Sequence, residues 1–436
     1  MKTILYWLRN DLRIHDNVIL STKLSSNDRL IPIYIFDNRF NEKHPLGFPR
    51  ISSYRKKFLL ETLSDLKNSF NKLKSDLLIY YGQPEVIIPK IASKYGVDIV
   101  YCTKEHSHEE IEHEVLVNKN LGNIPLKCVE QLTLIHPEHL PFDIKNVPDT
   151  FSAFRKAVEK ELKIRSPFDG PKRLPPLPES FKNNNFDFSL EFTQFHALKM
   201  DKRSAFNFRG GETEGLNRLK DYIWNKGLIT NYKNTRNGMI GSDYSSKFSP
   251  WLALGALSPR IIYSEVNRFE REVLKNESTG WMIFELIWRD YFRFITMKYG
   301  NKLFSKSGIK NFSKEYSNSY HLFNKWLSAK TGNDFIDANM KELNATGFMS
   351  NRGRQNAASY LVHDLDIDWR WGAAYFESQL IDYDVCSNWG NWMYVAGVGN
   401  DPRPNRKFNT SLQARKYDPE YQYRDLWLKP KLLKTG

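Results

Sequence analysis

The first 135 residues alternate short apolar, β-branched runs with long amphipathic stretches, and this alternation restricts the possible folds more than any other feature. The stretches Ser52–Leu73 and Glu85–Tyr95 have the hydrophobic period of helices. Strands separated by helices of this length pair in parallel, through right-handed crossovers. The pattern therefore predicts a parallel α/β sheet with a Rossmann-like layout. Strands are expected at Ile4–Trp7, Leu30–Phe36, Leu77–Tyr81, Asp98–Cys102 and Leu126–Val129.

The rest of the chain is organised differently. Residues 136–200 hold eight of the 20 prolines and lack clear periodicity, which is typical of a connection between domains. From about residue 203 to 428 the pattern is helical. Because 436 residues exceed the usual size of one hydrophobic core, two domains are expected. We predict an α/β domain over residues 1–135, a linker over 136–200 and an all-helical domain over 201–428.

Composition narrows the partners and the compartment. The net charge of +14 and the aromatic content of 14% favour a polyanion such as single-stranded nucleic acid, but also fit an enzyme with a phosphorylated cofactor. No run of 18 apolar residues occurs and the mean hydropathy is −0.56, so no membrane span is expected. The chain shows no signal-peptide pattern, and its three scattered cysteines form no disulfide framework. A reducing cytoplasm is the expected location.

Tryptophan is concentrated late in the chain. Ten of the 11 tryptophans lie beyond residue 220, and Trp369, Trp371, Trp389 and Trp392 fall within 24 residues. Aromatic side chains at helical spacing usually fill a core. Indole is also the side chain most easily oxidised by one electron, and it stacks well on planar ligands. The cluster therefore fits either a helical core or indoles that serve an aromatic cofactor.

Polar segments of the helical region have the chemistry of a ligand site. Residues 232–249 form a glycine-bearing loop that ends in hydroxyls and a lysine, which suits either a phosphate cradle or an ordinary capped loop. Glu285, Trp288 and Arg289 share one helical face at i, i+3 and i+4. They could hydrogen-bond and stack a heteroaromatic ring, or form an interhelical salt bridge beside a core tryptophan.

A second polar string runs from Gly347 to Asn356 and carries two arginines and three amides. Such groups are costly to bury without a partner, so a ligand or a backbone phosphate is expected there. Asp382, Asp384 and Asn388 could pair with the arginines and accept hydrogen bonds from a cofactor. The histidines lack partners at metal spacing, so no metal site is predicted.

Together these segments resemble the photolyase/cryptochrome family, and in particular its DASH-type cryptochromes. The resemblance runs from Tyr6 to about Leu428. Its most specific strings are Thr346–Gln355 and Gly399–Arg403, and it is also dense in Asp243–Trp251, Glu285–Phe294 and Asp382–Asn409.

This resemblance implies an α/β antenna domain followed by a helical domain that holds FAD. Arg354 and Asp382 would form an ion pair against the flavin, and Asn388 would face its N5. The residues expected to bind FAD are Tyr232, Ser245, Ser246, Lys247, Phe248, Ser249, Arg289, Asn351, Arg354, Asp382, Asp384 and Asn388.

The implied activity is that of a deoxyribodipyrimidine photo-lyase. Excited, fully reduced FAD would donate an electron to a cyclobutane pyrimidine dimer, preferentially in single-stranded or looped DNA. Gln355 stands where double-strand photolyases carry methionine, and Tyr394 replaces a tryptophan, which is the DASH pattern. The residues expected to contact DNA are Arg236, Glu285, Trp288, Asn351, Arg352, Gln355, Tyr394 and Arg403.

An electron-transfer chain is also implied, with one departure from the family pattern. Trp392 and Trp369 match the proximal and middle tryptophans that photoreduce FAD. The third is expected ten residues before Trp326, where Tyr316 stands, so photoreduction would persist but slow or reroute. Trp326 and Trp371 are assigned to packing, like Trp251 and Trp389. The expected catalytic set is Glu285, Trp288, Asn388, Trp392, Trp369 and Tyr316.

The remaining expectations concern the antenna and the partners. The acidic pair Glu109 and Glu110 would bind a folate-type antenna, 5,10-methenyltetrahydrofolate, although a solvated acidic helix would look the same. We expect a monomer that binds dimer-containing single-stranded DNA, with no obligate protein partner. The alternatives are a blue-light photoreceptor with residual DNA binding and a flavin-dependent protein without repair activity. The retained Glu285 and Trp288, and the lack of a C-terminal extension, favour the enzyme.

Overall fold

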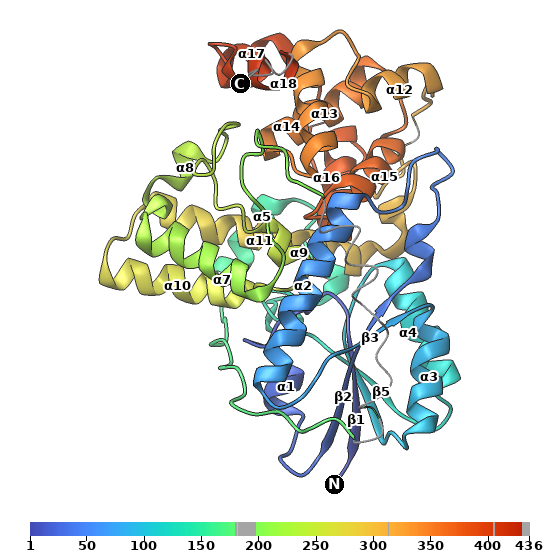
Figure 1. Cartoon of the computed structure of the whole chain (residues 1–436). Coiled ribbons are helices and arrows are strands. Elements are labelled where there is room, and N and C mark those ends of the chain that lie inside the picture. Colours follow the sequence, from blue (N-terminus) through green and yellow to red (C-terminus); the bar gives the residue numbers. More distant parts are fainter. Residues whose placement is uncertain (179–180, 182–197, 313, 404–405, 430–436) are drawn as a thin grey trace, which may run out of the picture.

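The computed structural model describes residues 1–178, 181, 198–312, 314–403 and 406–429. An α/β part built on a parallel sheet lies against a larger helical part (Figure 1). This arrangement confirms the fold class expected from the sequence. Residues 182–197 of the expected linker lie outside the described residues.

The sheet has five parallel strands in the order β3-β2-β1-β4-β5. Alternate residues of β1 face opposite layers, because side chains alternate across a strand. Ile4 and Tyr6 therefore pack on one side, and Leu5 and Trp7 on the other. The strands are β1 (Thr3–Leu8), β2 (Arg29–Phe36), β3 (Leu78–Tyr81), β4 (Ile99–Thr103) and β5 (Leu126–Val129).

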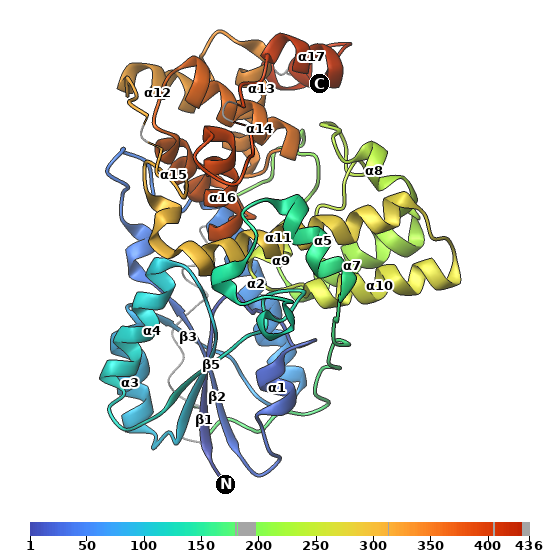
Figure 2. The same ribbon diagram turned by 180° about the vertical axis from the view of Figure 1, so that it is seen from behind.

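Helices cover both faces of the sheet, as buried parallel strands require. The helices α1 (Val18–Thr22) and α2 (Ser53–Lys72) pack on the Tyr6 face. The helices α3 (Pro84–Lys94) and α4 (His108–Asn120) cover the Trp7 face, as seen in Figure 2. The observed ends of the five strands, α2 and α3 lie within one or two residues of those expected from the sequence.

The helical part surrounds α11 (Glu277–Tyr299), which contacts helices from several parts of the chain. Its other helices are α7 (Glu212–Lys220), α8 (Tyr232–Thr235), α9 (Ser249–Ala253), α10 (Pro259–Glu272), α12 (Tyr320–Leu327), α13 (Asp334–Thr346), α14 (Asn351–Ser359), α15 (Trp369–Gln379), α16 (Val385–Ala396), α17 (Thr410–Tyr417) and α18 (Gln422–Leu428). Short turns are η1 (Asn38–Asn41), η2 (Pro137–His139), η3 (Ile144–Asn146), η5 (Asp221–Asn225), η6 (Leu228–Asn231), η7 (Gly300–Phe304) and η8 (Tyr360–Asp364).

The expectation of an unstructured connection over residues 136–200 is wrong for α5 (Phe151–Lys160). Phe151, Phe154 and Val158 point from this helix into the core of the helical part, beside α11 (Figure 2). The many prolines around α5 hid a short amphipathic segment with apolar residues at i, i+3 and i+7. The division into domains at residues 135 and 201 stays a prediction.

Asp16 anchors a buried polar junction between the α/β part and the helical part. Its side chain is fully buried and accepts hydrogen bonds from Arg165 Nη1 at 2.6 Å and Arg260 Nη1 at 3.2 Å. Ser258 donates to the same carboxylate at 2.5 Å. Buried charges are stable only with such partners, so this loop and these helical residues have one mutual arrangement.

Glu212 makes a second contact of this kind at the start of α7. Its two carboxylate oxygens accept the backbone N–H groups of Ile14 and His15, each at 2.8 Å, and one oxygen also pairs with the His15 ring. Burial raises the pKa of Glu212, but His15 and the two N–H groups outweigh it and hold the pKa below its usual value. His15 therefore has a structural role in this contact.

Glu212→Gln should destabilise the fold by about 1–3 kcal/mol near neutral pH, because an amide N–H₂ then faces backbone N–H donors. The folded pKa of Glu212 is lowered, so its stabilisation is complete above the unfolded pKa of about 4.3 and is lost as the pH falls through the folded pKa. Urea unfolding measured across pH should show the gap between wild type and variant closing in acid. Glu214→Gln, in the same helical turn, is the matched control. A gap that stays constant with pH would contradict this account.

Candidate functional site

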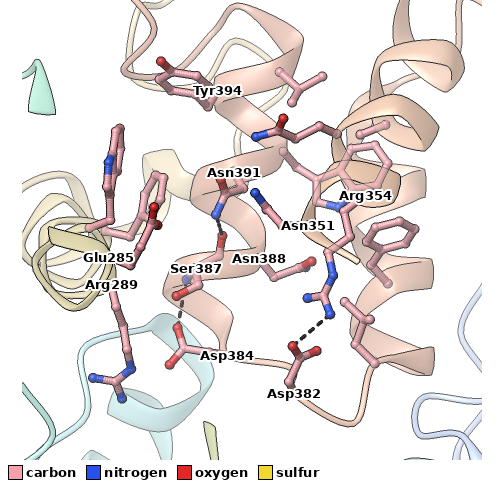
Figure 3. Close-up of a pocket in the computed structure, with 18 of the residues that line it drawn as sticks. Glu285, Arg289, Asn351, Arg354, Asp382, Asp384, Ser387, Asn388, Asn391 and Tyr394 are labelled. Atoms are coloured by element: carbon pink, nitrogen blue, oxygen red, sulfur yellow. Dashed lines mark hydrogen bonds and ion pairs between the residues drawn. The ribbon is translucent and has the colours of Figure 1, made fainter. Parts of the chain in front are cut away.

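Two adjoining cavities of about 440 and 280 Å³ open among α11, α14, α16 and the loop after α8. The larger and smaller cavities share lining residues, so they are neighbouring parts of the space between α11 and α14. Figure 3 shows α11 residues on one side of this space and Arg354 and Asp382 on the other. The shared lining residues are Arg236, Glu285, Arg289, Asn351, Arg354, Asp382, Asp384 and Ser387.

Glu285 lies at the mouth of this space with two hydrogen-bond donors on one oxygen. Its Oε1 accepts from Arg236 Nη1 at 2.6 Å and from Trp281 Nε1 at 3.1 Å. Burial raises the pKa of Glu285, while Arg236 and the two hydrogen bonds oppose the rise, and the net pKa is above the usual value. The carboxyl group is therefore poised to gain a proton if Arg236 moves away.

Trp288 forms an apolar wall one helical turn along α11. Its ring stacks on Phe151 of α5, with centroids 3.6 Å apart, and meets the ring of Tyr394 edge-on at 6.1 Å. Phe151 fixes the back of the indole, so its other face is held toward the larger cavity. The expected placement of Glu285, Trp288 and Arg289 on one face is confirmed.

Arg289 lines both cavities, and two of its N–H groups donate to backbone carbonyls. It donates from Nη1 to the carbonyl of Leu132 at 2.8 Å and from Nη2 to that of Leu252 at 3.3 Å. Burial lowers its pKa. This arginine therefore links α11 to the segment after β5, at Leu132, and to α9, at Leu252.

Arg354 and Asp382 form the ion pair expected from the sequence, with Nη2 and Oδ2 2.8 Å apart (Figure 3). The arginine also donates from Nε to the carbonyl of Met349 at 2.9 Å. The second carboxylate oxygen, Asp382 Oδ1, is buried and lacks a hydrogen-bond partner among the described residues. A buried acceptor of this kind calls for an N–H donor on a ligand.

Asn388 and Asp384 extend this polar wall along α16. Asn388 donates from Nδ2 to the carbonyl of Ala373 at 3.0 Å, which fixes the amide at the cavity surface. Asp384 caps α16 by accepting the N–H of Ser387 at 2.8 Å, and it pairs with Arg293 at 2.5 Å. Burial raises the pKa of Asp384, but Arg293 and Arg289 hold it below the usual value.

The polar loop before α9 lines the smaller cavity, as a phosphate cradle requires. All of the expected loop residues contribute to its lining: Tyr232, Ser245, Ser246, Lys247, Phe248 and Ser249. Arg218 was not predicted from the sequence. It is buried and donates to the carbonyls of Ser242, Ser245 and Ser246 at 2.9–3.2 Å. These bonds hold the loop's curvature from behind.

Lys247 does not present its charge as the loop sequence suggested. Its backbone is in the left-handed region with φ +62°, and its ammonium group is buried over the ring of Tyr244. Burial lowers its pKa well below the usual value. The backbone and hydroxyl groups of the loop, rather than this cation, therefore face the smaller cavity.

The residues expected to contact DNA divide into two groups. Arg236, Asn351, Gln355 and Tyr394 line the larger cavity together with Glu285 and Trp288. Arg352 and Arg403 do not line it. Arg352 donates to Gln355 and Asn237, each at 2.9 Å, so it supports the rim from behind. Arg403 pairs with the buried Asp401 at 3.1 Å on the nearby surface.

The residues that line the larger cavity and were not predicted from the sequence include Arg406, Asn391 and Trp281. Arg406 lies with its guanidinium 4.5 Å from the centroid of the Tyr394 ring and pairs with Asp401 at 2.8 Å. Asn391 and Trp281 also face the cavity. The spacing of Asn388 and Asn391 on α16, and of Trp281 and Glu285 on α11, could have indicated both. No local pattern points to Arg406, which reaches Tyr394 from a separate loop.

The expected electron-transfer residues lie behind the larger cavity. Trp392 lines it and is almost fully buried. Trp369 is fully buried and donates from Nε1 to the carbonyl of Lys306 at 3.2 Å. Tyr316 is half-buried, in the same hydrophobic cluster.

Glu109 and Glu110 line a third cavity, of about 580 Å³, between the α/β part and α15–α16. Glu109 is largely exposed and pairs with Arg50 at 2.6 Å. Glu110 accepts a hydrogen bond from Ser107, and burial raises its pKa. The pair thus faces a cavity rather than bulk solvent alone.

Two kinds of feature are absent from the part of the chain that the structure describes. Within the described ranges, no three His, Cys, Asp or Glu side chains are grouped so that they could hold a metal ion. Among the same residues, no helix is long and apolar enough to cross a membrane.

Comparison with known proteins shows which family the chain belongs to. Residues 281–434 match the model of the FAD binding domain of DNA photolyase, and residues 4–179 match that of DNA photolyase. The cryptochrome DASH of Gloeobacter violaceus is 47% identical over 432 residues, covering 98% of this chain and 85% of the relative. The chain belongs to the photolyase/cryptochrome family, in its DASH branch.

Solved structures agree with this assignment. A cryptochrome from Synechocystis sp. matches with a TM-score of 0.94 and 48% identity, over 98% of this chain and 88% of that one. A bacterial class III photolyase from Agrobacterium tumefaciens matches with a TM-score of 0.82 and 26% identity, over 98% and 86%. The helical part of this DASH-branch protein is thus an FAD-binding domain. The cavity fits that cofactor, because the unpartnered Asp382 Oδ1 offers an acceptor for a ring N–H and the loop before α9 offers a cradle for a diphosphate.

Asp382→Ala should weaken FAD binding about tenfold to a hundredfold, because it leaves Arg354 without its carboxylate and removes the unpartnered acceptor. The measurement is a titration of flavin-free protein with FAD, together with the flavin-to-protein absorbance ratio of purified samples. Asp364→Ala is the matched control, since Asp364 pairs with Lys407 at 2.7 Å outside the cavities. Unchanged affinity in Asp382→Ala would place the flavin elsewhere.

Proposed function

We propose that this protein is a DNA photolyase that uses blue light to split cyclobutane pyrimidine dimers, preferentially in single-stranded or looped DNA. One observation carries the proposal. Glu285, Trp288 and Tyr394 line the same cavity as Arg354 and Asp382. A dimer bound against the first group would touch a flavin held by the second, and direct transfer of one electron needs that proximity.

The division of labour between cofactor and protein follows from this arrangement. Bound in its fully reduced form, FAD supplies the electron that light transfers to the dimer and that returns once the ring has split. Arg354, Asp382 and Asn388 hold and orient the flavin ring. Tyr232 and residues 245–249, with Asn351 and Asp384, hold the rest of the cofactor, while Arg289 braces this wall.

Glu285 is proposed to bind the dimer bases directly. In the free protein Arg236 opposes the rise in the pKa of this carboxyl group that burial causes. A dimer that displaces Arg236 would leave a buried carboxyl group that favours its protonated form and can donate to a base carbonyl. Arg236 would then be free to meet a DNA phosphate, so substrate entry and protonation of Glu285 are coupled.

We attribute the proposed preference for unpaired DNA to the walls of the larger cavity. Flipping a base out of a duplex costs a few kcal/mol, and least where pairing is already lost. Here Tyr394 is smaller than the tryptophan of double-strand photolyases, and the polar amide of Gln355 stands in place of their methionine. Arg236, Arg352, Arg403 and Arg406 supply positive charge near the entrance for the phosphates.

The third cavity is proposed to hold a folate-type antenna. Its lining combines the acidic pair Glu109 and Glu110 with Arg50, His44 and Asn10. Carboxylates suit the N–H donors of a pterin ring. We also propose that the protein acts as a monomer in the cytoplasm.

Illumination of the reduced protein with dimer-containing oligonucleotides should repair single strands faster than duplexes. Loss of the dimer is measured by chromatography.

Glu285→Gln should cut the repair yield about tenfold while FAD stays bound, because an amide cannot supply the carboxyl proton. Glu277→Gln, on the same helix but exposed, is the control. No repair of either substrate would contradict the photolyase and leave the photoreceptor alternative. Loss of flavin from Glu285→Gln would show that Glu285 serves the cofactor instead.

Glu109→Gln should lower the amount of bound pterin about tenfold, because the neutral amide loses its charge-assisted hydrogen bond. The readout is the fluorescence of pterin released when protein reconstituted with 5,10-methenyltetrahydrofolate is denatured. Glu112→Gln, on the same helix and also largely exposed, is the matched control. Equal pterin content in both variants would contradict the antenna assignment.

A further inference from the structure

We propose that Trp326 begins a second electron-transfer branch, which connects Trp392 to the exposed Tyr320 by way of Phe323 and Trp371. The sequence assigned Trp326 and Trp371 to packing. The proposal rests on the proposed role of Trp392 as the donor nearest the flavin. It explains how the chain can photoreduce its flavin with a tyrosine at the usual end of the tryptophan chain.

Tyr316 is poorly placed to end such a chain, because an oxidised tyrosine must lose its phenolic proton. Its Oη is buried and has no hydrogen-bond partner among the residues that the structure describes. Burial raises the pKa of Tyr316, and Asp368 and Asp366 add to the rise. The phenol therefore lacks a base that could take its proton.

The charges around Tyr316 also oppose a positive hole on its ring. Lys314 and Lys306 place their ammonium groups 4.7 and 5.8 Å from the ring centroid. A cation over an aromatic face is attracted to its electron density, so it is repelled when the ring loses an electron. The nearby Asp366 pairs with Lys314 at 3.0 Å and Asp368 pairs with Arg370 at 2.7 Å, which offsets the negative charge of both carboxylates.

Trp326 offers Trp392 a closely packed partner on another side. The two indole centroids are 6.3 Å apart in an edge-to-face contact, and both side chains are almost fully buried. Phe376 packs against both, at 5.0 Å from Trp392 and 5.9 Å from Trp326. Rings in direct contact give strong electronic coupling, which favours fast electron transfer.

The hydrogen bond of Trp326 suits a transient positive charge. Its Nε1 donates to the backbone carbonyl of Ala357 at 3.1 Å. An oxidised indole is a stronger N–H donor, so this bond strengthens when the electron leaves. The carbonyl thus stabilises the oxidised form of Trp326.

Helix α12 carries the branch to the surface. Tyr320, Phe323 and Trp326 follow one another at i, i+3 and i+6, so they share one helical face. Phe323 stacks on Trp326 at 6.0 Å and meets Trp371 of α15 at 5.2 Å. Tyr320 packs on Trp371 at 4.8 Å and is 56% exposed, so water can take its proton.

The electron and proton balance of this branch is complete. The excited flavin gains one electron from Trp392, which takes one from Trp326. Trp326 then takes an electron from Trp371, and Phe323 only mediates the electronic coupling between them. Trp371 takes an electron from Tyr320, which releases its phenolic proton to water. A thiol in solution returns one electron and one proton to Tyr320, and two thiyl radicals combine as a disulfide.

The first test measures photoreduction of the oxidised holoprotein under blue light with a thiol reductant. Trp326→Phe and Trp371→Phe should each slow it about tenfold, whereas Tyr316→Phe should change it less than about twofold. Equal FAD content and helical circular dichroism will show that these variants fold. A normal rate in Trp326→Phe together with a collapse in Tyr316→Phe would overturn the branch. A normal rate in Trp392→Phe would instead overturn the role of Trp392, which distinguishes the two failures.

The second test locates the radical independently of the photoreduction rate. Illumination with a nitroso spin trap, followed by peptide mass spectrometry, should label Tyr320. The label should disappear in Tyr320→Phe and in Trp326→Phe, and it should persist in Tyr316→Phe. A label on Tyr316 that survives Trp326→Phe would contradict the proposal.

Discussion

Two buried charged residues of α11, Asp290 and Arg293, hold the sheet and the cofactor-side helices in one arrangement. Asp290 accepts the backbone N–H groups of residues 134–135 at 3.1 and 2.8 Å, where the chain leaves the sheet. Burial raises the pKa of Asp290 to about 6, against the pull of these donors and neighbouring arginines. Arg293 pairs with Asp384, the cap of α16, at 2.5 Å and with Glu105 beyond β4 at 3.7 Å. An unpartnered charge here would cost several kcal/mol, so loop, strand and helix can meet in few other ways.

The candidate site follows from this constraint, because Glu285 and Trp288 of the same helix form its wall. A helix held by Asp290 and Arg293 cannot rotate, so Glu285 and Trp288 point into the cavity whether or not a ligand is present. Phe151 then fixes the indole of Trp288 from behind. The charges on α11 that stabilise the fold therefore also pre-organise the proposed catalytic side chains, and rigid supports of this kind are what precise positioning requires.

The sequence predicted the sheet almost to the residue, because most of its strands are short apolar runs set between helical stretches. It also placed Glu285 and the Arg354–Asp382 pair, where helical spacing and a highly specific motif coincide. The missed features depend on contacts between distant segments. Arg218 supports its loop through backbone carbonyls, and Arg406 reaches Tyr394 from a separate loop. Neither contact leaves a local pattern of spacing or charge.

The tryptophans show why residue type alone could not separate packing from electron transfer. Burying an aromatic side chain brings its ring into contact with others, so an efficient core and an efficient relay have the same spacing. What separates them is the local charge and the fate of a proton. Two lysines lie over Tyr316 at the usual terminal position, while a carbonyl accepts from Trp326 and solvent reaches Tyr320. A substitution at one end of an electron-transfer chain therefore need not stop electron flow. The remaining residues can pass the electron to other aromatic side chains that contact them in the core.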